Sequence, residues 1–116
     1  LWCDCTIDLH DAVLTEIAGF RGATFNDADF RGATFNHYAR FWGATFKRDA
    51  NFWGATFTNA DFERATFKRD ADFRGATFTN VANFQGATFN RSAPPMGLPP
   101  GWVDEDGLPH GARRRR

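Results

Sequence analysis

The stretch FWGATFKRDANFWGATF, residues 41–57, contains the hexapeptide FWGATF twice, and the two copies begin eleven residues apart. Both belong to a longer pattern, because all 14 Phe residues of the chain lie between positions 20 and 89. Neighbouring Phe residues are five or six positions apart, and every one has Ala two positions before it. A regular self-similarity of this kind identifies a repeat protein.

The repeating unit predicts a very short strand followed by a bend. Apolar residues five positions apart would be scattered around an α-helix, whose apolar face recurs about every 3.6 residues. Ala and Phe two positions apart instead face the same side of a strand. The residues that follow are rich in Gly, Asn and Asp, which favour turns. Repetition of this unit predicts a β-solenoid with Ala and Phe on the inside.

The pentapeptides ADFRG, ADFER and ANFQG of this array resemble those of the pentapeptide-repeat family. The resemblance covers residues 7–90 and implies the fold of that family, an all-β, right-handed quadrilateral β-helix with four pentapeptides in each coil. For an array of this length it implies about four coils. The chain departs from the family pattern at four six-residue Phe spacings. We interpret each extra residue as a bulge at a fixed corner of the coil.

Four pentapeptides in each coil predict four faces, each with its own column of inward-facing Phe side chains. The predicted columns are Phe20, Phe41, Phe62 and Phe84 on face one; Phe25, Phe46, Phe67 and Phe89 on face two; Phe30, Phe52 and Phe73 on face three; and Phe35, Phe57 and Phe78 on face four. Each buried Phe contributes about 1.5–3 kcal/mol. These columns are therefore the predicted core.

The chain divides into four predicted segments. Residues 1–6 are expected to be an N-terminal cap or the end of a fragment, and residues 7–90 to form the solenoid. Residues 91–103 contain two Pro-Pro pairs, which cannot continue a strand ladder, and are expected to cap the last coil. Residues 104–116 are polar and end in four Arg, so we expect a disordered basic tail.

Composition limits the classes of partner. Lys+Arg and Asp+Glu number 14 each, so the net charge is zero, which disfavours nucleic acid or an anionic membrane as a partner. No apolar run approaches the ~20 residues that a membrane-spanning helix needs. The two Cys form no disulfide framework and favour a reducing, cytoplasmic compartment.

The sequence predicts no catalytic constellation. His10, His37 and His110 lie in different segments without ligand spacing around them, and Cys3 and Cys5 are interpreted as capping or core residues. We therefore expect a protein that is not an enzyme and that uses no cofactor, metal ion or small-molecule substrate.

Four outward positions are candidate contact residues: Trp42, Trp53, Lys47 and Lys68. Trp42 is assigned to face one and Trp53 to face three, so the two rings are expected on opposite sides and cannot form one aromatic clamp. Outward Thr residues recur on faces two and four, where cross-strand Thr pairs stabilise a sheet.

The favoured function is a non-enzymatic structural or protein-interaction module. The family resemblance implies an alternative, DNA mimicry that binds a type II topoisomerase, but residues 20–90 carry nine bases against seven acids, and mimicry needs an acidic surface. A minor alternative is surface or ice binding through the Thr ladders, with one Thr per rung. The sequence leaves end-to-end stacking of identical copies open.

Overall fold

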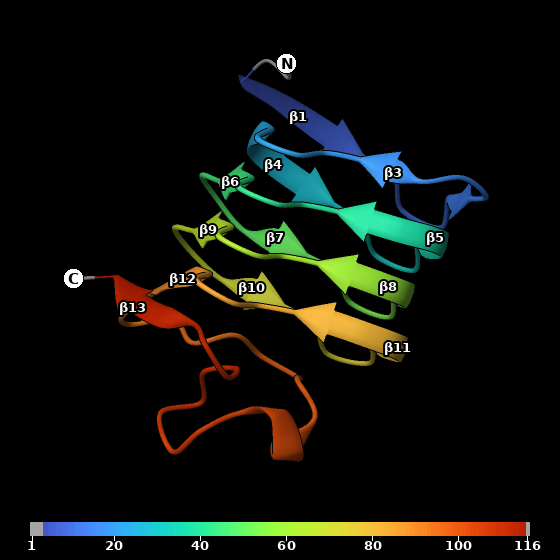
Figure 1. Ribbon diagram of the computed structural model, residues 1–116. Helices are drawn as coiled ribbons and strands as arrows, with labels where there is room; N and C mark the ends of the chain where they lie inside the picture. The colour runs from blue at the N-terminus through green and yellow to red at the C-terminus, as the bar shows by residue number, and fades with distance from the viewer. Residues whose placement is uncertain (1–3, 116) are drawn as a thin grey trace.

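The computed structural model describes the backbone of residues 4–115 and, within it, the side chains of residues 6–113. The chain is an all-β solenoid of about four coils whose strands pair in parallel with the next coil (Figure 1). The predicted fold class is therefore confirmed. No helix among the described residues is long and apolar enough to cross a membrane.

The strands form two parallel sheets that bend around the corners of the coil. The larger sheet consists of β1 (Asp4–Asp8), β4 (Thr24–Asp29), β6 (Thr45–Phe46), β7 (Ala50–Asn51), β9 (Thr66–Phe67), β10 (Ala71–Asp72), β12 (Thr88–Asn90) and β13 (Arg113–Arg115). The smaller sheet consists of β2 (Val13–Leu14), β3 (Ala18–Gly19), β5 (Thr34–Arg40), β8 (Thr56–Asp61) and β11 (Thr77–Asn83). The larger sheet covers faces two and three, and the smaller sheet covers faces four and one.

Strand register places equivalent residues of successive coils side by side. Phe25 pairs with Phe46, Phe46 with Phe67 and Phe67 with Phe89. The extra residues of the six-residue spacings are absorbed as irregularities of the ladder, for example between Phe35 and Tyr38 of β5. The interpretation of these positions as bulges is confirmed there and at the equivalent corner of β11.

The Phe rings stack along the solenoid axis in the four columns that the spacing predicts. Ring centroids within a column are 4.8–5.2 Å apart, close to the spacing of adjacent strands. Rings of face one meet rings of face three edge to face, for example Phe41 and Phe52 at 5.6 Å. The six central rings, Phe25, Phe41, Phe46, Phe62, Phe67 and Phe89, are at most 1% exposed.

One coil corner carries Arg where its counterparts carry Gly. Gly22, Gly43 and Gly86 follow the Phe of face one by two positions and have φ between 67° and 71°. Arg64 occupies the same position with φ 59°. Because this left-handed region strains residues with a Cβ atom, Arg64 adopts a costly backbone conformation.

The C-terminal segment returns to the solenoid over its described residues, both in residues 91–103, which the sequence predicts to cap the last coil, and in residues 104–115, part of the predicted disordered tail. Trp102, in the short 3-10 helix η1 (Pro100–Trp102), packs on Phe78 with ring centroids 4.9 Å apart, and Leu98 and Leu108 are buried. Strand β13 then extends the ladder of face two by pairing with β12. The physical reason is the open end of the last coil, whose apolar rings and unpaired strand edge the returning chain covers.

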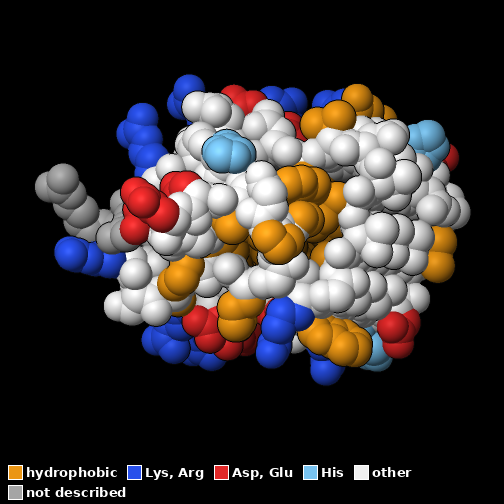
Figure 2. All heavy atoms as spheres, turned by 90° about the horizontal axis from the view of Figure 1, so that it is seen from below, with side chains coloured by type: hydrophobic (Ala, Val, Ile, Leu, Met, Phe, Trp, Pro, Cys, Tyr) orange, Lys and Arg blue, Asp and Glu red, His pale blue; other side chains and the backbone are white. Residues whose placement is uncertain are grey.

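Seen from the C-terminal end, the molecule shows hydrophobic side chains towards the middle and charged side chains mostly near the margin (Figure 2). At the other end the ladder begins with β1 at Asp4, within the segment predicted as a cap of residues 1–6. Leu1, Trp2 and Cys3 lie outside the described residues, and so does the side chain of Cys5.

Candidate interaction surface

Face three presents two adjacent columns of polar side chains. The residue before each inward Leu or Phe gives the column Asp8, Asp29, Asn51 and Asp72, whose members pair in register. The residue after each inward Leu or Phe gives the column His10, Arg31, Trp53 and Arg74. We call these the acidic column and the Arg–Trp column. Both follow from strand geometry, since residues two apart on a strand point to the same side.

Two rungs of face three hold bidentate ion pairs, where a rung is the set of residues that one coil contributes to a face. Arg31 donates from Nε to Asp29 Oδ1 at 2.9 Å and from Nη2 to Oδ2 at 2.7 Å. Arg74 repeats this arrangement with Asp72 at 3.0 and 2.9 Å. Each carboxylate also accepts the backbone N–H of its Arg. The hydrogen bond from the Arg side chain is the main cause that lowers the pKa of Asp29 and Asp72 and raises the pKa of Arg31 and Arg74.

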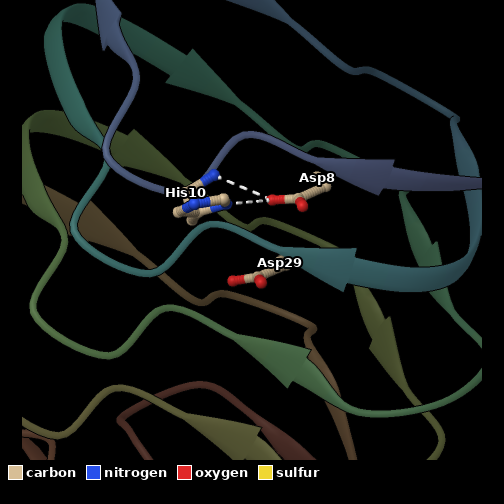
Figure 3. A group of neighbouring side chains, drawn as sticks. All are labelled: Asp8, His10 and Asp29. Carbon is tan, nitrogen blue, oxygen red and sulfur yellow. Dashed lines mark hydrogen bonds and ion pairs between the residues drawn. The ribbon is translucent and has the colours of Figure 1, made fainter.

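The first rung of face three pairs Asp8 with His10 (Figure 3). His10 Nδ1 lies 2.6 Å from Asp8 Oδ1, which also accepts the His10 backbone N–H at 3.1 Å. The side-chain hydrogen bond lowers the pKa of Asp8 and raises the pKa of His10. The next coil brings Asp29 close, so that donor atoms of Asp8, His10 and Asp29 lie within 4.8 Å of one another.

The Asp8–His10–Asp29 group has the chemistry of a metal-ligand set, but its donor atoms already have partners. Both Asp29 oxygens bind Arg31, and Asp8 Oδ1 binds His10. The His10 and Asp8 side chains are more than half exposed. An ion would have to displace these hydrogen bonds, so the residues do not fit a resident metal ion. The sequence interpretation of His10 as an isolated residue missed this group, although the spacing Asp-x-His, from the end of β1 into the turn that follows, indicates the pair.

A shallow groove runs beside the acidic column, at the corner between faces two and three. Its volume is about 390 Å³, and it is lined by Thr6, Ile7, Asp8, Asp27, Ala28, Asp29, Arg31, Asp49 and Asn51. Four of these residues are carboxylates. Arg48 approaches Asp27 to 3.8 Å, and Asp49 accepts the backbone N–H of Asp70. The groove therefore presents carboxylate oxygens whose charge is only partly neutralised by Arg.

Trp53 is the most exposed described Trp, with 55% of its surface accessible. Its rung lies between those of Arg31 and Arg74, and its backbone N–H is bound by Asn51 Oδ1 at 3.1 Å. A hollow of about 240 Å³ beside its ring is lined by His10, Asp11, Arg31, Gly32 and Trp53. Trp53 and Arg31 thus line one hollow, and Arg74 follows Trp53 in the next coil of the same column.

Trp42 belongs to a different surface. It lies in the outward column of face one, below Arg21, whose guanidinium carbon is 5.4 Å from the ring centroid. Its exposed fraction is 36%, lower than that of Trp53. The structure therefore does not bring Trp42 and Trp53 together.

Lys47 and Lys68 lie on face two, in neighbouring coils of one column. Their backbone N–H groups bind Phe25 O and Phe46 O, and Asn90 Nδ2 donates to Lys68 O at 2.8 Å. The Lys47 side chain is exposed and that of Lys68 is half-buried. They do not contribute to the groove or to the hollow beside Trp53.

Face four carries more Thr than the single ladder of the sequence analysis. Thr34, Thr56 and Thr77 pair in register, and Thr58 and Thr79 follow Phe57 and Phe78 as second outward Thr residues in their rungs. Exposed apolar side chains border this face, namely Val13, Ile17, Tyr38 and Val81.

The fold and these surfaces define a β-solenoid repeat protein whose features are outward columns of side chains. A protein-family model described as pentapeptide repeats (9 copies) matches residues 9–56 and again residues 52–94. The chain belongs to the pentapeptide-repeat family, as the sequence pattern predicts. No curated protein and no solved structure matches the chain.

Proposed function

We propose that this chain is a non-enzymatic protein-interaction module that contacts its partner through face three. The observation that carries this proposal is the placement of Trp53 between Arg31 and Arg74. Trp and Arg are the residues most enriched among those that dominate interface energies. A 55% exposed indole in one column with Arg31 and Arg74 offers apolar area and hydrogen-bond donors on one surface.

The ion pairs of face three support this role because they hold the contact groups in place. Arg31 and Arg74 are each fixed by two side-chain hydrogen bonds to Asp29 and Asp72. Side chains that are ordered before binding lose less conformational entropy when the complex forms. The Phe columns beneath keep the strand spacing constant, so the whole face is preorganised.

The chemistry of the face also describes the partner. Trp53 favours an apolar pocket on the partner, and the carboxylate groove beside it favours a Lys or Arg side chain. We propose a protein partner that presents an apolar pocket to Trp53 and, close beside it, a Lys or Arg side chain to the groove. DNA mimicry is less well supported, because Asp29 and Asp72 are paired with Arg and the surface lacks the dense negative charge of a duplex.

The test compares two Trp substitutions on different faces. The chain is used as bait, the captured protein is identified, and its Kd is measured for wild type, Trp53→Ala and Trp42→Ala. We expect Trp53→Ala to weaken binding at least about tenfold, the ordinary effect of a central interface Trp. Trp42→Ala, on face one, should change Kd less than twofold.

Equal effects of the two substitutions would contradict the assignment of face three. Circular dichroism of both variants checks that the solenoid stays folded. Turnover on a substrate panel that a point substitution abolishes would contradict a non-enzymatic role. A gyrase supercoiling assay and a thermal-hysteresis measurement test the two alternatives, DNA mimicry and ice binding through the Thr ladders.

A further inference from the structure

Face two concentrates basic side chains that the neutral total charge conceals. Its two outward columns contain Thr24, Thr45, Thr66, Thr88 and Arg113, and Asn26, Lys47, Lys68 and Asn90. No Asp or Glu occurs among the described side chains of these two columns, from Thr24 to Arg113. Arg48, Arg69 and Arg91 lie at its corner towards face three. We call Lys47, Lys68, Arg113, Arg48, Arg69 and Arg91 the basic strip.

Strand β13 lengthens the basic strip by one coil. Arg113 pairs in register with Thr88, and Arg115 with Asn90, so the C-terminal Arg run continues the ladder of face two. The Arg113 N–H donates to Ala87 O at 2.7 Å, which fixes this strand against the last coil. Among the described side chains, Arg113 therefore adds one cation to face two.

Three carboxylates, Asp27, Asp49 and Asp70, lie at the same corner as Arg48 and Arg69 and offset part of the positive charge. Asp27 and Asp49 line the groove of face three, and Asp49 accepts the Asp70 backbone N–H. Arg48 Nη1 lies 3.8 Å from Asp27 Oδ2, an ion pair too long for a hydrogen bond. The six cations of the strip outnumber these three carboxylates.

We propose that the basic strip binds the phosphate backbone of nucleic acid without reading its sequence. Lys, Arg, Thr and Asn are the side chains that donate to phosphate oxygens, and face two consists of these residues. Their regular spacing, with neighbouring rings of the core column 4.8–5.1 Å apart, gives one donor set per rung. This surface is distinct from face three and does not depend on the function proposed for it.

The same face argues against an acidic protein as the partner. Protein interfaces need an apolar centre, whereas interfaces with nucleic acid are polar and positively charged. Among residues 6–113 the exposed large apolar side chains are Val13, Ile17, Tyr38, Trp42, Trp53 and Val81, and none of these lies on face two. The absence of an aromatic side chain from the described part of this face also removes base stacking, which leaves contacts to the backbone alone.

The test is fluorescence anisotropy of a labelled duplex of about 30 base pairs with the full chain, at several salt concentrations. Each phosphate contact steepens the fall of log K with log salt by about 0.9. Lys47→Glu/Lys68→Glu should weaken binding at least about tenfold at about 50 mM salt and reduce the salt slope by about 2. The matched control, Arg21→Glu/Arg74→Glu, makes the same charge change on faces one and three.

The outcomes separate the proposal from its competitors. Retained binding by the control and by Trp53→Ala supports the strip and distinguishes it from the contact face with Trp53. Equal loss in both double variants overturns the placement on face two. No binding of wild type at low salt overturns the proposal, and so does a polyglutamate that binds as tightly as the duplex. Circular dichroism confirms that each variant is folded.

Discussion

The ring of Phe46 stacks on that of Phe67 with centroids 4.8 Å apart and an angle of 2° between their planes. The neighbouring residue Lys47 lies in the same strand region but points outward and is exposed. Adjacent positions of one rung therefore contribute to different properties of the molecule: the inner ring to stability, and the outer cation to the surface.

Phe46→Ala should destabilise the protein by about 3–5 kcal/mol, because it opens a cavity in a fully buried column. Lys47→Ala should change the free energy of unfolding by less than about 0.5 kcal/mol. Urea unfolding followed by circular dichroism measures both. If Phe46→Ala does not fold, Phe46→Leu opens a smaller cavity and should lower the free energy of unfolding by less. Similar effects at positions 46 and 47 would contradict the inward assignment.

Arg64→Gly should stabilise the protein by about 0.5–1 kcal/mol, because Gly adopts φ 59° without the strain of a Cβ atom. The matched substitution is Gly43→Ala, at the same corner one coil earlier. No atom lies within 4 Å of a Cβ added there, so the change tests backbone strain alone. We expect it to destabilise by about 1 kcal/mol. Thermal unfolding of the two variants should give shifts of opposite sign, and shifts of one sign would contradict this account.

The sequence predicted the core because the solenoid repeats one local rule. Ala and Phe two positions apart face inward wherever they occur, so their spacing predicted the inward residues, and the family resemblance supplied the four columns. The pairs Asp29–Arg31 and Asp72–Arg74 also follow from two-residue spacing, but the meeting of Asp8 with Asp29 depends on the length of a coil. The length of a coil follows from the repeat as a whole and not from the residues around Asp8.

The C-terminal segment could not be predicted in the same way. Its contacts join Trp102 to Phe78, and Arg113 to Ala87, across 24 and 26 residues respectively, and no periodic pattern announces them. The paired Pro residues of 91–103 indicated a cap without its contacts, and the polar composition of residues 104–116 indicated disorder because that segment was considered alone. The exposed end of the last coil, a property of the folded chain, supplies the surface on which this segment orders.

His10 should titrate above the ordinary pKa of His, because Asp8 accepts its side-chain hydrogen bond and stabilises the charged imidazole. A group whose pKa is raised by folding stabilises the protein below its unfolded pKa, about 6.5, and this contribution is lost as pH rises through the folded pKa. NMR titration of the His10 ring measures the shift. Asp8→Asn should return the pKa towards its ordinary value, and Asp11→Asn should move it less. Unchanged titration in Asp8→Asn would contradict the hydrogen bond.

Acid should weaken the rungs that contain Asp29 and Asp72. Their pKa values are lowered by the Arg hydrogen bonds, so their contribution to stability is present above the unfolded pKa, about 3.9, and is lost as pH falls through the folded pKa. Asp72→Asn should therefore lower Tm at pH 7 and have less effect near pH 2. Thermal unfolding across this pH range measures the difference. A constant difference in Tm would show that the ion pair contributes nothing to the acid response.

Hydrogen exchange should distinguish an ordered C-terminal segment from a disordered one. The Arg113 N–H donates to Ala87 O at 2.7 Å and the Asp104 N–H to Leu108 O at 2.8 Å, so both amides should exchange more slowly than in a free peptide. Leu108→Ala removes a buried side chain from this segment and should accelerate exchange at Arg113 while leaving Thr66, in the middle of the solenoid, protected. Exchange at Arg113 as fast as in an unfolded peptide, in the wild-type chain, would contradict the docking of β13 and would reduce the basic strip to the lysines and arginines of the repeats.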